Sequence, residues 1–146
     1  MTSNKKVEKV EDLKGVKLRA PGIQMYIKTW EYLGASPVPM DASEIYTGLQ
    51  QGTVDAQENP VMYSYGNAFY DVCDYLILTN HVFSTDVFIF NDDFFNKLPA
   101  EQQQVFREAA KEAGDFRTKL VEEKETETIS NANILNFTYD IFDFFK

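Results

Sequence analysis

The sequence predicts an α/β fold with a mostly parallel sheet flanked by helices. Segments of strand length, either apolar or alternating, recur between amphipathic segments of helical length. That alternation is typical of parallel strands joined by helices. The 146 residues are 44% hydrophobic and include 12 Phe and 8 Tyr. A chain of this size and composition can bury a substantial core, so wholesale disorder is not expected.

The first half of the chain contains three predicted strands with helices between them. Residues 16–20 alternate as a short strand that the Pro21-Gly22 turn closes, and a helix follows over 24–32. An extended segment at 37–40 precedes a helix that Asp41 and Glu44 open as a capping box and Gly52 ends. Residues 54–58 form the third strand. Helical spacing then runs from Met62 to Leu76, although 75–78 can also begin another strand.

The second half is predicted to hold a buried strand and two helices. Residues 87–90 are an unbroken apolar run, which is typical of a strand covered on both faces. Asp92-Asp93 begins one helix and Pro99 suits the first turn of the next. The second helix carries a narrow apolar stripe of Val105, Ala109, Ala113, Phe116 and Leu120, which fades into a solvated face at 122–128. Residues 135–141 alternate as a strand, and five aromatic residues fall in the last ten, which suggests a surface that needs covering.

Charge and composition exclude several classes of function. A formal net charge of −9 and a pI near 4.6 argue against nucleic-acid binding, which needs a basic footprint. A single cysteine excludes an internal disulfide. Because the chain also has only one histidine, it lacks the set of His and Cys ligands that a zinc site of this type needs. No cofactor or metal is expected. The chain has no apolar run of 18 or more residues and no secretory signal at its start, so we expect it either to stay in the cytoplasm or to lack its targeting segment.

Two polar residues at predicted strand ends point to a pocket for a small organic acid. Arg19 ends the first strand, and its planar fork of donors matches a carboxylate. Asn59 follows the third strand and offers both a donor and an acceptor. Ligands gather beyond the carboxyl ends of parallel strands. The alternatives are a solvated surface arginine and an asparagine that forms a side-chain turn before Pro60.

The order and spacing of several motifs resemble one protein family. They are DLKGVKLRAPG at 12–22, LGASPVPMDASEIYTGLQQG at 33–52, VDAQENP at 54–60 and LTNH at 78–81, extended by KLP at 97–99 with QQ at 102–103 and EAA at 108–110. Over roughly residues 9–125 the chain is similar to the substrate-binding proteins of tripartite ATP-independent periplasmic (TRAP) transporters, dicarboxylate-binding type. The resemblance implies a periplasmic-binding-protein-like fold of two lobes that close over a carboxylic acid and deliver it to membrane permease subunits, without catalysis.

The resemblance also implies roles for particular positions. Arg19 corresponds to the arginine that holds the ligand carboxylate and Asn59 to the pocket asparagine. Gly22 and Ile23 correspond to positions that approach the ligand. Ala42 stands where relatives often carry a larger wall residue, so extra room is expected there.

By the same alignment, residues 1–8 are a lead-in and 9–84 belong to the second lobe. Residues 85–124 return to the first lobe as a strand plus helices, and 125–146 cross back. Family members are about twice this length, so the resemblance implies a fragment whose parent is periplasmic or extracytoplasmic and whose own binding is impaired.

Other residues are expected to be structural. His81 is interpreted as a hydrogen-bonding residue, Cys73 as a small buried hydrophobe, and Tyr63, Tyr65, Phe69 and Tyr70 as core. An enzyme is the weakest alternative, because the sequence has no nucleophile elbow, Cys–His pairing or phosphate-binding glycine loop. The other alternative is an interaction module that completes its core by dimerising or by exchanging elements with a second copy.

Overall fold

The structure, a computed structural model, describes residues 1–82, 85–134 and 138–141. The chain divides into two compact units. Unit 1 comprises Met1–His81 and Glu127–Lys146, and unit 2 comprises Val82–Thr126. The assignment of the predicted segments 9–84, 85–124 and 125–146 to two lobes stays a prediction.

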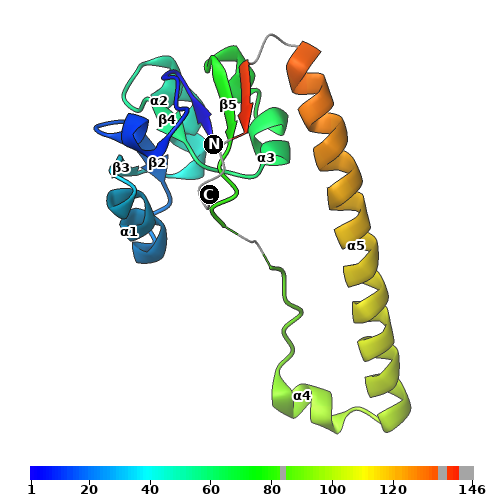
Figure 1. Ribbon diagram of the computed structural model, residues 1–146. Coiled ribbons are helices and arrows are strands. Elements are labelled where there is room, and N and C mark those ends of the chain that lie inside the picture. The colour runs from blue at the N-terminus through cyan, green and yellow to red at the C-terminus, as the bar shows by residue number, and fades with distance from the viewer. Residues whose placement is uncertain (83–84, 135–137, 142–146) are drawn as a thin grey trace. The chain divides into compact units, whose positions relative to one another are not determined.

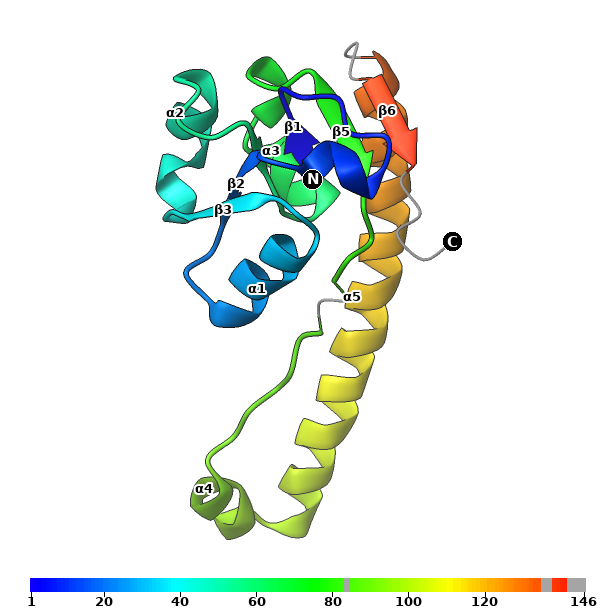
Figure 2. The ribbon, with the colours of Figure 1, turned by 60° about the vertical axis from the view of Figure 1, so that its left-hand side comes forward.

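Unit 1 is built on one mixed sheet (Figures 1 and 2). Its strands are β1 (Thr2–Ser3), β2 (Lys17–Ala20), β3 (Ser36–Pro39), β4 (Ala56–Gln57), β5 (Tyr75–Leu78) and β6 (Thr138–Ile141), in the order β3-β2-β4-β1-β5-β6. Among the described strands, β2 runs parallel to β3 and β4, and β5 runs parallel to β6. β1 is antiparallel to both β4 and β5. The α/β fold is confirmed, and the sheet is mixed because the expected lead-in of residues 1–8 supplies this central strand.

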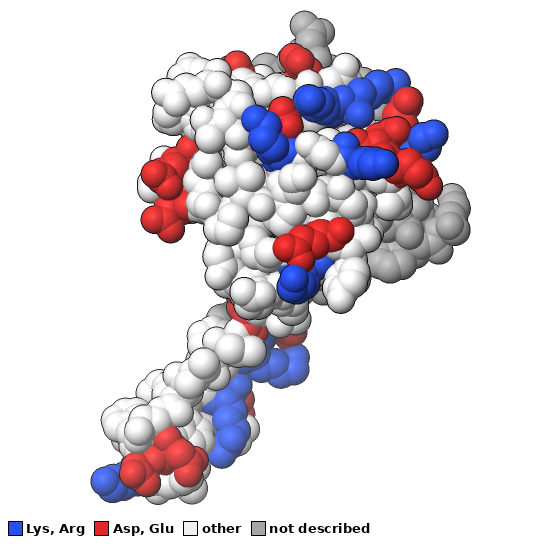
Figure 3. All heavy atoms as spheres, turned by 90° about the vertical axis from the view of Figure 1, so that its left-hand side faces the viewer, with Lys and Arg blue, Asp and Glu red and all other residues white. Residues whose placement is uncertain are grey.

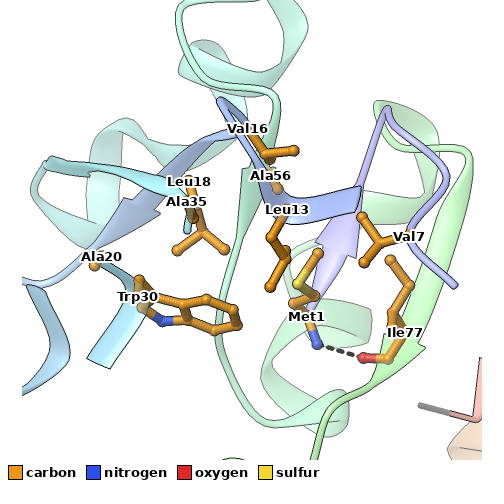
Figure 4. Close-up of a cluster of buried hydrophobic side chains, with 10 residues drawn as sticks. All are labelled: Met1, Val7, Leu13, Val16, Leu18, Ala20, Trp30, Ala35, Ala56 and Ile77. Carbon is orange, nitrogen blue, oxygen red and sulfur yellow. Dashed lines mark hydrogen bonds between the residues drawn. The ribbon is translucent and has the colours of Figure 1, made fainter. Parts of the chain in front are cut away.

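Helices cover both faces of the sheet. One face packs against α1 (Gln24–Tyr32) and a 3₁₀ turn, η1 (Val10–Leu13), around the fully buried Trp30. Figure 4 shows Trp30 and Met1 pointing into the same cluster as Leu13 and Leu18. The other face packs against α2 (Ile45–Gln50), α3 (Val61–Gly66) and the 3₁₀ turn η3 (Phe69–Asp71). Neighbouring residues of β5 divide between the two faces, Ile77 in the first cluster and Leu76 in the second, as the two-residue period of a strand requires.

Two local predictions in unit 1 are corrected. The capping box of Asp41 and Glu44 does not form: a 3₁₀ turn, η2 (Ala42–Glu44), follows Asp41 without a side-chain cap, and the α-helix begins only at Ile45. The helix expected from Met62 to Leu76 ends at Gly66, because Ala68 adopts a left-handed backbone with φ of 55°. The chain then reaches β5 through η3. The alternative reading of 75–78 as a strand is the one observed.

Unit 2 contains helical structure and an extended apolar segment. α4 (Asp92–Lys97) begins where Asn91 Oδ1 accepts a hydrogen bond from Phe94 N, and α5 (Ala100–Ile134) follows Pro99 and continues into unit 1. The predicted strand at 87–90 is wrong. All four of its residues are exposed and extended without strand pairing. A strand needs a partner for its backbone groups, and the described part of unit 2 offers no strand edge. The predicted stripe on α5 is exposed at Val105, Phe116 and Leu120.

The end of the chain is only partly described. The predicted strand at 135–141 is observed over Thr138–Ile141. Residues 135–137 and 142–146 lie outside the described residues, and so do four of the five terminal aromatic residues. Among the described helices, none is both long and apolar enough to cross a bilayer.

Candidate ligand-binding site

The five predicted site residues follow the carboxyl ends of three adjacent parallel strands. The strands β3, β2 and β4 lie side by side in the sheet and point the same way. Arg19, Gly22 and Ile23 belong to the end of β2 and the turn after it. Ala42 follows β3, and Asn59 follows β4. All five therefore lie near the carboxyl ends of the strands, on the side of the sheet where ligands bind in open α/β folds.

Arg19 points into the protein and not into bulk solvent. Leu18 and Ala20 belong to the cluster under α1, so strand alternation turns Arg19 to the opposite face. The residue is only 5% exposed, and its Nε donates to Met40 O at 2.9 Å. Burial lowers the pKa of the guanidinium, while the Glu58 carboxylate opposes that shift. Among the described residues this is the only hydrogen bond that the Arg19 side chain makes, so its terminal nitrogens keep donors for an anion.

Asn59 is held by the strand residue that precedes it by two positions. Its Nδ2 donates to Gln57 Oε1 at 2.7 Å. Gln57 is fully buried, and its register partner on β2 is Arg19. The alternative role of Asn59 as a local side-chain turn is not what the structure shows, because the amide bonds a side chain and not the backbone ahead of it.

Glu58, Thr79 and His81 form a largely buried polar cluster that no local sequence pattern indicates. Glu58 is 7% exposed, and its Oε2 lies 3.4 Å from His81 Nε2. His81 Nδ1 is 2.7 Å from Thr79 Oγ1, and its ring packs on Trp30 at a centroid distance of 4.7 Å. His81 thus has the structural contacts expected of it. Strand alternation could have predicted opposite directions for Gln57 and Glu58, but not that both would be buried.

The remaining predicted residues are exposed and make no specific contact that defines a pocket. Ile23 precedes α1 and is 55% exposed, and Gly22 and Ala42 are also exposed. A side chain added at Gly22 would meet no atom within 4 Å. Their approach to a ligand stays a prediction.

The described residues give no sign of metal or nucleic-acid chemistry. Among them, no group of three or more His, Cys, Asp or Glu side chains could hold a metal ion. On the face drawn in Figure 3, the described basic and acidic side chains are intermixed and form no continuous basic field. Cys73 is buried, as expected, and burial raises the pKa of its thiol to about 11.

Comparison with known proteins decides the family. The family model described as "Bacterial extracellular solute-binding protein, family 7" matches residues 1–136. The chain belongs to this family. Its identification as a TRAP-type solute-binding protein from sequence motifs is therefore confirmed, and the family is one of binding proteins and not of enzymes.

Relatives and solved structures of the family align with nearly the whole chain. The 2,3-diketo-L-gulonate-binding periplasmic protein YiaO of Escherichia coli (strain K12) is 39% identical over 81% of this chain and 36% of its own length. The sialic acid-binding periplasmic protein SiaP of Vibrio cholerae is 33% identical over 99% of this chain and 46% of its own. A TRAP periplasmic solute-binding protein of Actinobacillus succinogenes 130Z with bound L-galactonate superposes with a TM-score of 0.85 at 32% identity, over 98% of this chain and 47% of that chain. The chain thus spans less than half the length of each of these proteins.

The solutes named for these proteins and for other solved members differ in chemistry. They include sugar acids and sialic acid, and also orotic acid and sn-glycerol-3-phosphate. The dicarboxylate that the sequence resemblance suggested is therefore not confirmed, and the family alone does not choose the solute.

Proposed function

We propose that this chain carries the carboxylate-binding part of a TRAP transporter solute-binding protein, which captures a small organic acid in the periplasm and delivers it to the membrane permease. Arg19 holds the carboxylate, Asn59 contacts a neighbouring oxygen, and Gly22, Ile23 and Ala42 line the approach. Most solutes named for the relatives are carboxylic acids, which supports this ligand class without favouring a dicarboxylate.

The observation that carries the proposal is the state of Arg19. An arginine residue that is only 5% exposed, whose side chain is anchored through Nε and whose terminal nitrogens have no hydrogen-bond partner among the described residues, is prepared for a planar anion. A surface arginine would instead lie in water with a mobile side chain, and its ion pairs would contribute little to the free energy of folding or binding.

Isothermal titration calorimetry with L-galactonate as the probe tests the proposal. Replacing Arg19 by Ala should weaken binding by about 10- to 150-fold, because a charge-assisted pair contributes roughly 1.5–3 kcal/mol. Arg19→Lys should recover part of the affinity, since it keeps the charge but loses the fork.

Lys17→Ala is the matched control, because it removes an exposed cation from the same strand and should leave the affinity unchanged. Equal affinities for Arg19→Ala and the unmodified chain would contradict the role of Arg19. Because the chain spans less than half the length of each of these relatives, the titrations use a protein of the relatives' length. A folded protein of that length that binds neither L-galactonate nor sialic acid would count against the proposed function as a whole.

A second candidate is self-association, which the exposed apolar surface of unit 2 favours. The surface comprises Val87, Phe88, Ile89, Phe90, Phe94, Val105, Phe106 and Phe116, each at least 38% exposed. Large aromatic side chains bury about 150–250 Å² each when covered, so the five Phe residues of this surface, which are 38–68% exposed, offer roughly 500 Å². Three exposed aliphatic side chains add to this area, and a stable interface takes about 800 Å² from each partner. A second copy of the chain is the occupant that supplies an equal apolar area.

A further inference from the structure

The extended segment that precedes α4 in unit 2 is fixed to α5 by alternate side chains. Asp86 Oδ2 lies 2.6 Å from Arg117 Nη2, and the centre of the Phe90 ring lies 5.2 Å from that of the Phe106 ring. Phe88 lines one pocket together with Phe90 and Phe106. Three residues that are two positions apart in sequence therefore face the same helix, and a period of two is the side-chain period of a β-strand.

The other side chains and the backbone of the segment are open. By the same alternation Val87 and Ile89 are directed away from α5, and they are 72% and 84% exposed, whereas Phe90 is 41% exposed. Among the described residues, no hydrogen bond joins the N–H or C=O groups of 86–90 to another backbone group. The segment thus has the conformation of a strand with unpaired edges, and such an edge is a template for pairing with another chain.

The sequence of the segment suits pairing with a second copy of itself in one particular register. Two copies that pair through the same segment about a two-fold axis run antiparallel. With the axis at Phe88, Val87 lies opposite Ile89 of the second copy, and Phe88 lies opposite Phe88. Aromatic and β-branched pairs of this kind stabilise antiparallel strands. With the axis at Ile89, Asp86 would instead lie opposite Asp92, and like charges directly opposite each other are destabilising.

We propose that two copies of the chain associate by pairing their segments 86–90 as antiparallel strands centred on Phe88. The pairing satisfies backbone groups that are open in a single copy, and main-chain hydrogen bonds supply much of the affinity in strand addition. The face of the paired strands that carries Asp86, Phe88 and Phe90 already rests on α5 of each copy. This inference rests on the second candidate function, self-association, and specifies how the copies meet. It does not involve Arg19 or a ligand.

Hydrogen exchange of the backbone amides of the unmodified chain tests the pairing, with sedimentation equilibrium to measure the dimer. In an antiparallel pair, only alternate N–H groups point to the other strand. Between about 1 and 100 µM, one alternate set of amides in 86–90 should therefore slow as the dimer forms, by at least about tenfold. The other set should change much less. The amide of the exposed Gly22 in unit 1 is the control and should exchange equally at both concentrations.

A symmetric disulfide tests the register. Phe88→Cys places two thiols opposite each other, where the Cα atoms of paired residues are about 4.5–5.5 Å apart and within disulfide range. Ile89→Cys is the matched control, because residue 89 of one copy meets residue 89 of the other only diagonally, at about 7–8 Å. With oxidised glutathione as the electron acceptor, Phe88→Cys should form the covalent dimer at least about tenfold faster. Cys73 can stay in place because it is buried.

The outcomes separate this inference from self-association itself. A dimer whose amides slow equally in both sets, or not at all, would overturn the strand pairing and leave self-association standing. Covalent dimers that form equally fast from Phe88→Cys and Ile89→Cys would overturn the register. A monomer at the highest concentration would overturn self-association together with this inference, whereas the binding of an organic acid is tested separately through Arg19→Ala.

Discussion

Arg19 carries a cost to the stability of the ligand-free chain. The residue is only 5% exposed, and its side chain donates to one backbone carbonyl and makes no ion pair with any described residue. Burying a cation without a contacting counter-charge is unfavourable. Glu58 reduces the penalty from a distance, which keeps the pKa of Arg19 from falling further. Such a local conflict with stability is expected at functional sites, and under the proposed function a bound carboxylate would supply the missing counter-charge.

A second buried cation-forming group, the α-amine of Met1, should make stability depend on pH. The amine is fully buried and donates to Ile77 O at 2.7 Å (Figure 4), and burial lowers its pKa from 8.0 to about 5. Between pH 5 and 8 the unfolded chain therefore binds more protons than the folded chain, so the free energy of unfolding rises with pH across that window. The rise should reach about 4 kcal/mol at most, at 1.36 kcal/mol per unit. Urea denaturation of the 146-residue chain at several pH values measures it.

The α-amine can also be observed directly. With ¹⁵N-labelled methionine, its resonance should titrate near pH 5 in the folded chain and near 8 in urea. A titration near pH 8 in the folded chain, together with a flat stability profile from pH 5 to 8, would contradict the prediction.

At the scale of elements, sequence patterns predicted those whose causes are local. The strand, helix and extended segment from residue 17 to residue 39 are all observed, because alternation, amphipathic spacing and the Pro21-Gly22 turn lie within a few residues. β1 could not be predicted, since Thr2 and Ser3 are polar and become a strand only between two partners far along the chain. The strand predicted at 87–90 is wrong for the opposite reason. Its local apolar pattern is typical of a strand, but the described residues provide no neighbouring strand with which it could pair.

The predictions for the candidate site also divide into features with local causes and features that depend on distant residues. Arg19 and Asn59 could be placed at strand ends because strand ends can be located from sequence, whereas their contact with a ligand stays a prediction. The burial of Gln57 could not be predicted, because its Nε2 donates to Thr2 Oγ1, which is 55 residues away in sequence. A glutamine is usually exposed, so nothing local marks this one as buried and paired.

Two glycines at helix ends should respond oppositely to substitution. Gly52, after α2, has φ of +70°, whereas Gly66 is the last residue of α3 and has helical geometry; a side chain would meet no atom within 4 Å at either position. Gly52→Ala should therefore destabilise by about 1 kcal/mol, because only the backbone strain differs. Gly66→Ala should be neutral or stabilising by up to about 1 kcal/mol. Urea denaturation followed by fluorescence of Trp30, the one tryptophan, compares them, and similar losses at both positions would contradict the role of backbone conformation.

At the scale of the whole molecule, the two units differ in what they bury. The two clusters of buried hydrophobic residues lie in unit 1. The aromatic side chains of unit 2 contact one another at Phe90, Phe95 and Phe106, and Arg107 lies 4.8 Å from the centre of the Phe95 ring. Much of their surface still faces solvent. Unit 2 therefore has the apolar side chains of a hydrophobic core, but the described residues leave many of them exposed to solvent.

Self-association should follow if a second copy provides that coverage. Sedimentation equilibrium from about 1 to 100 µM, a range suited to an interface of standard area, should show a dimer for the unmodified chain. Ile89→Lys should shift it to monomer, because Ile89 is 84% exposed and a buried, unpaired lysine opposes association. Tyr32→Lys, at a residue of unit 1 that is 88% exposed, should leave the dimer intact. A monomer at the highest concentration would exclude a second copy as the partner of the unit 2 surface, and loss of the dimer in both variants would place the interface elsewhere.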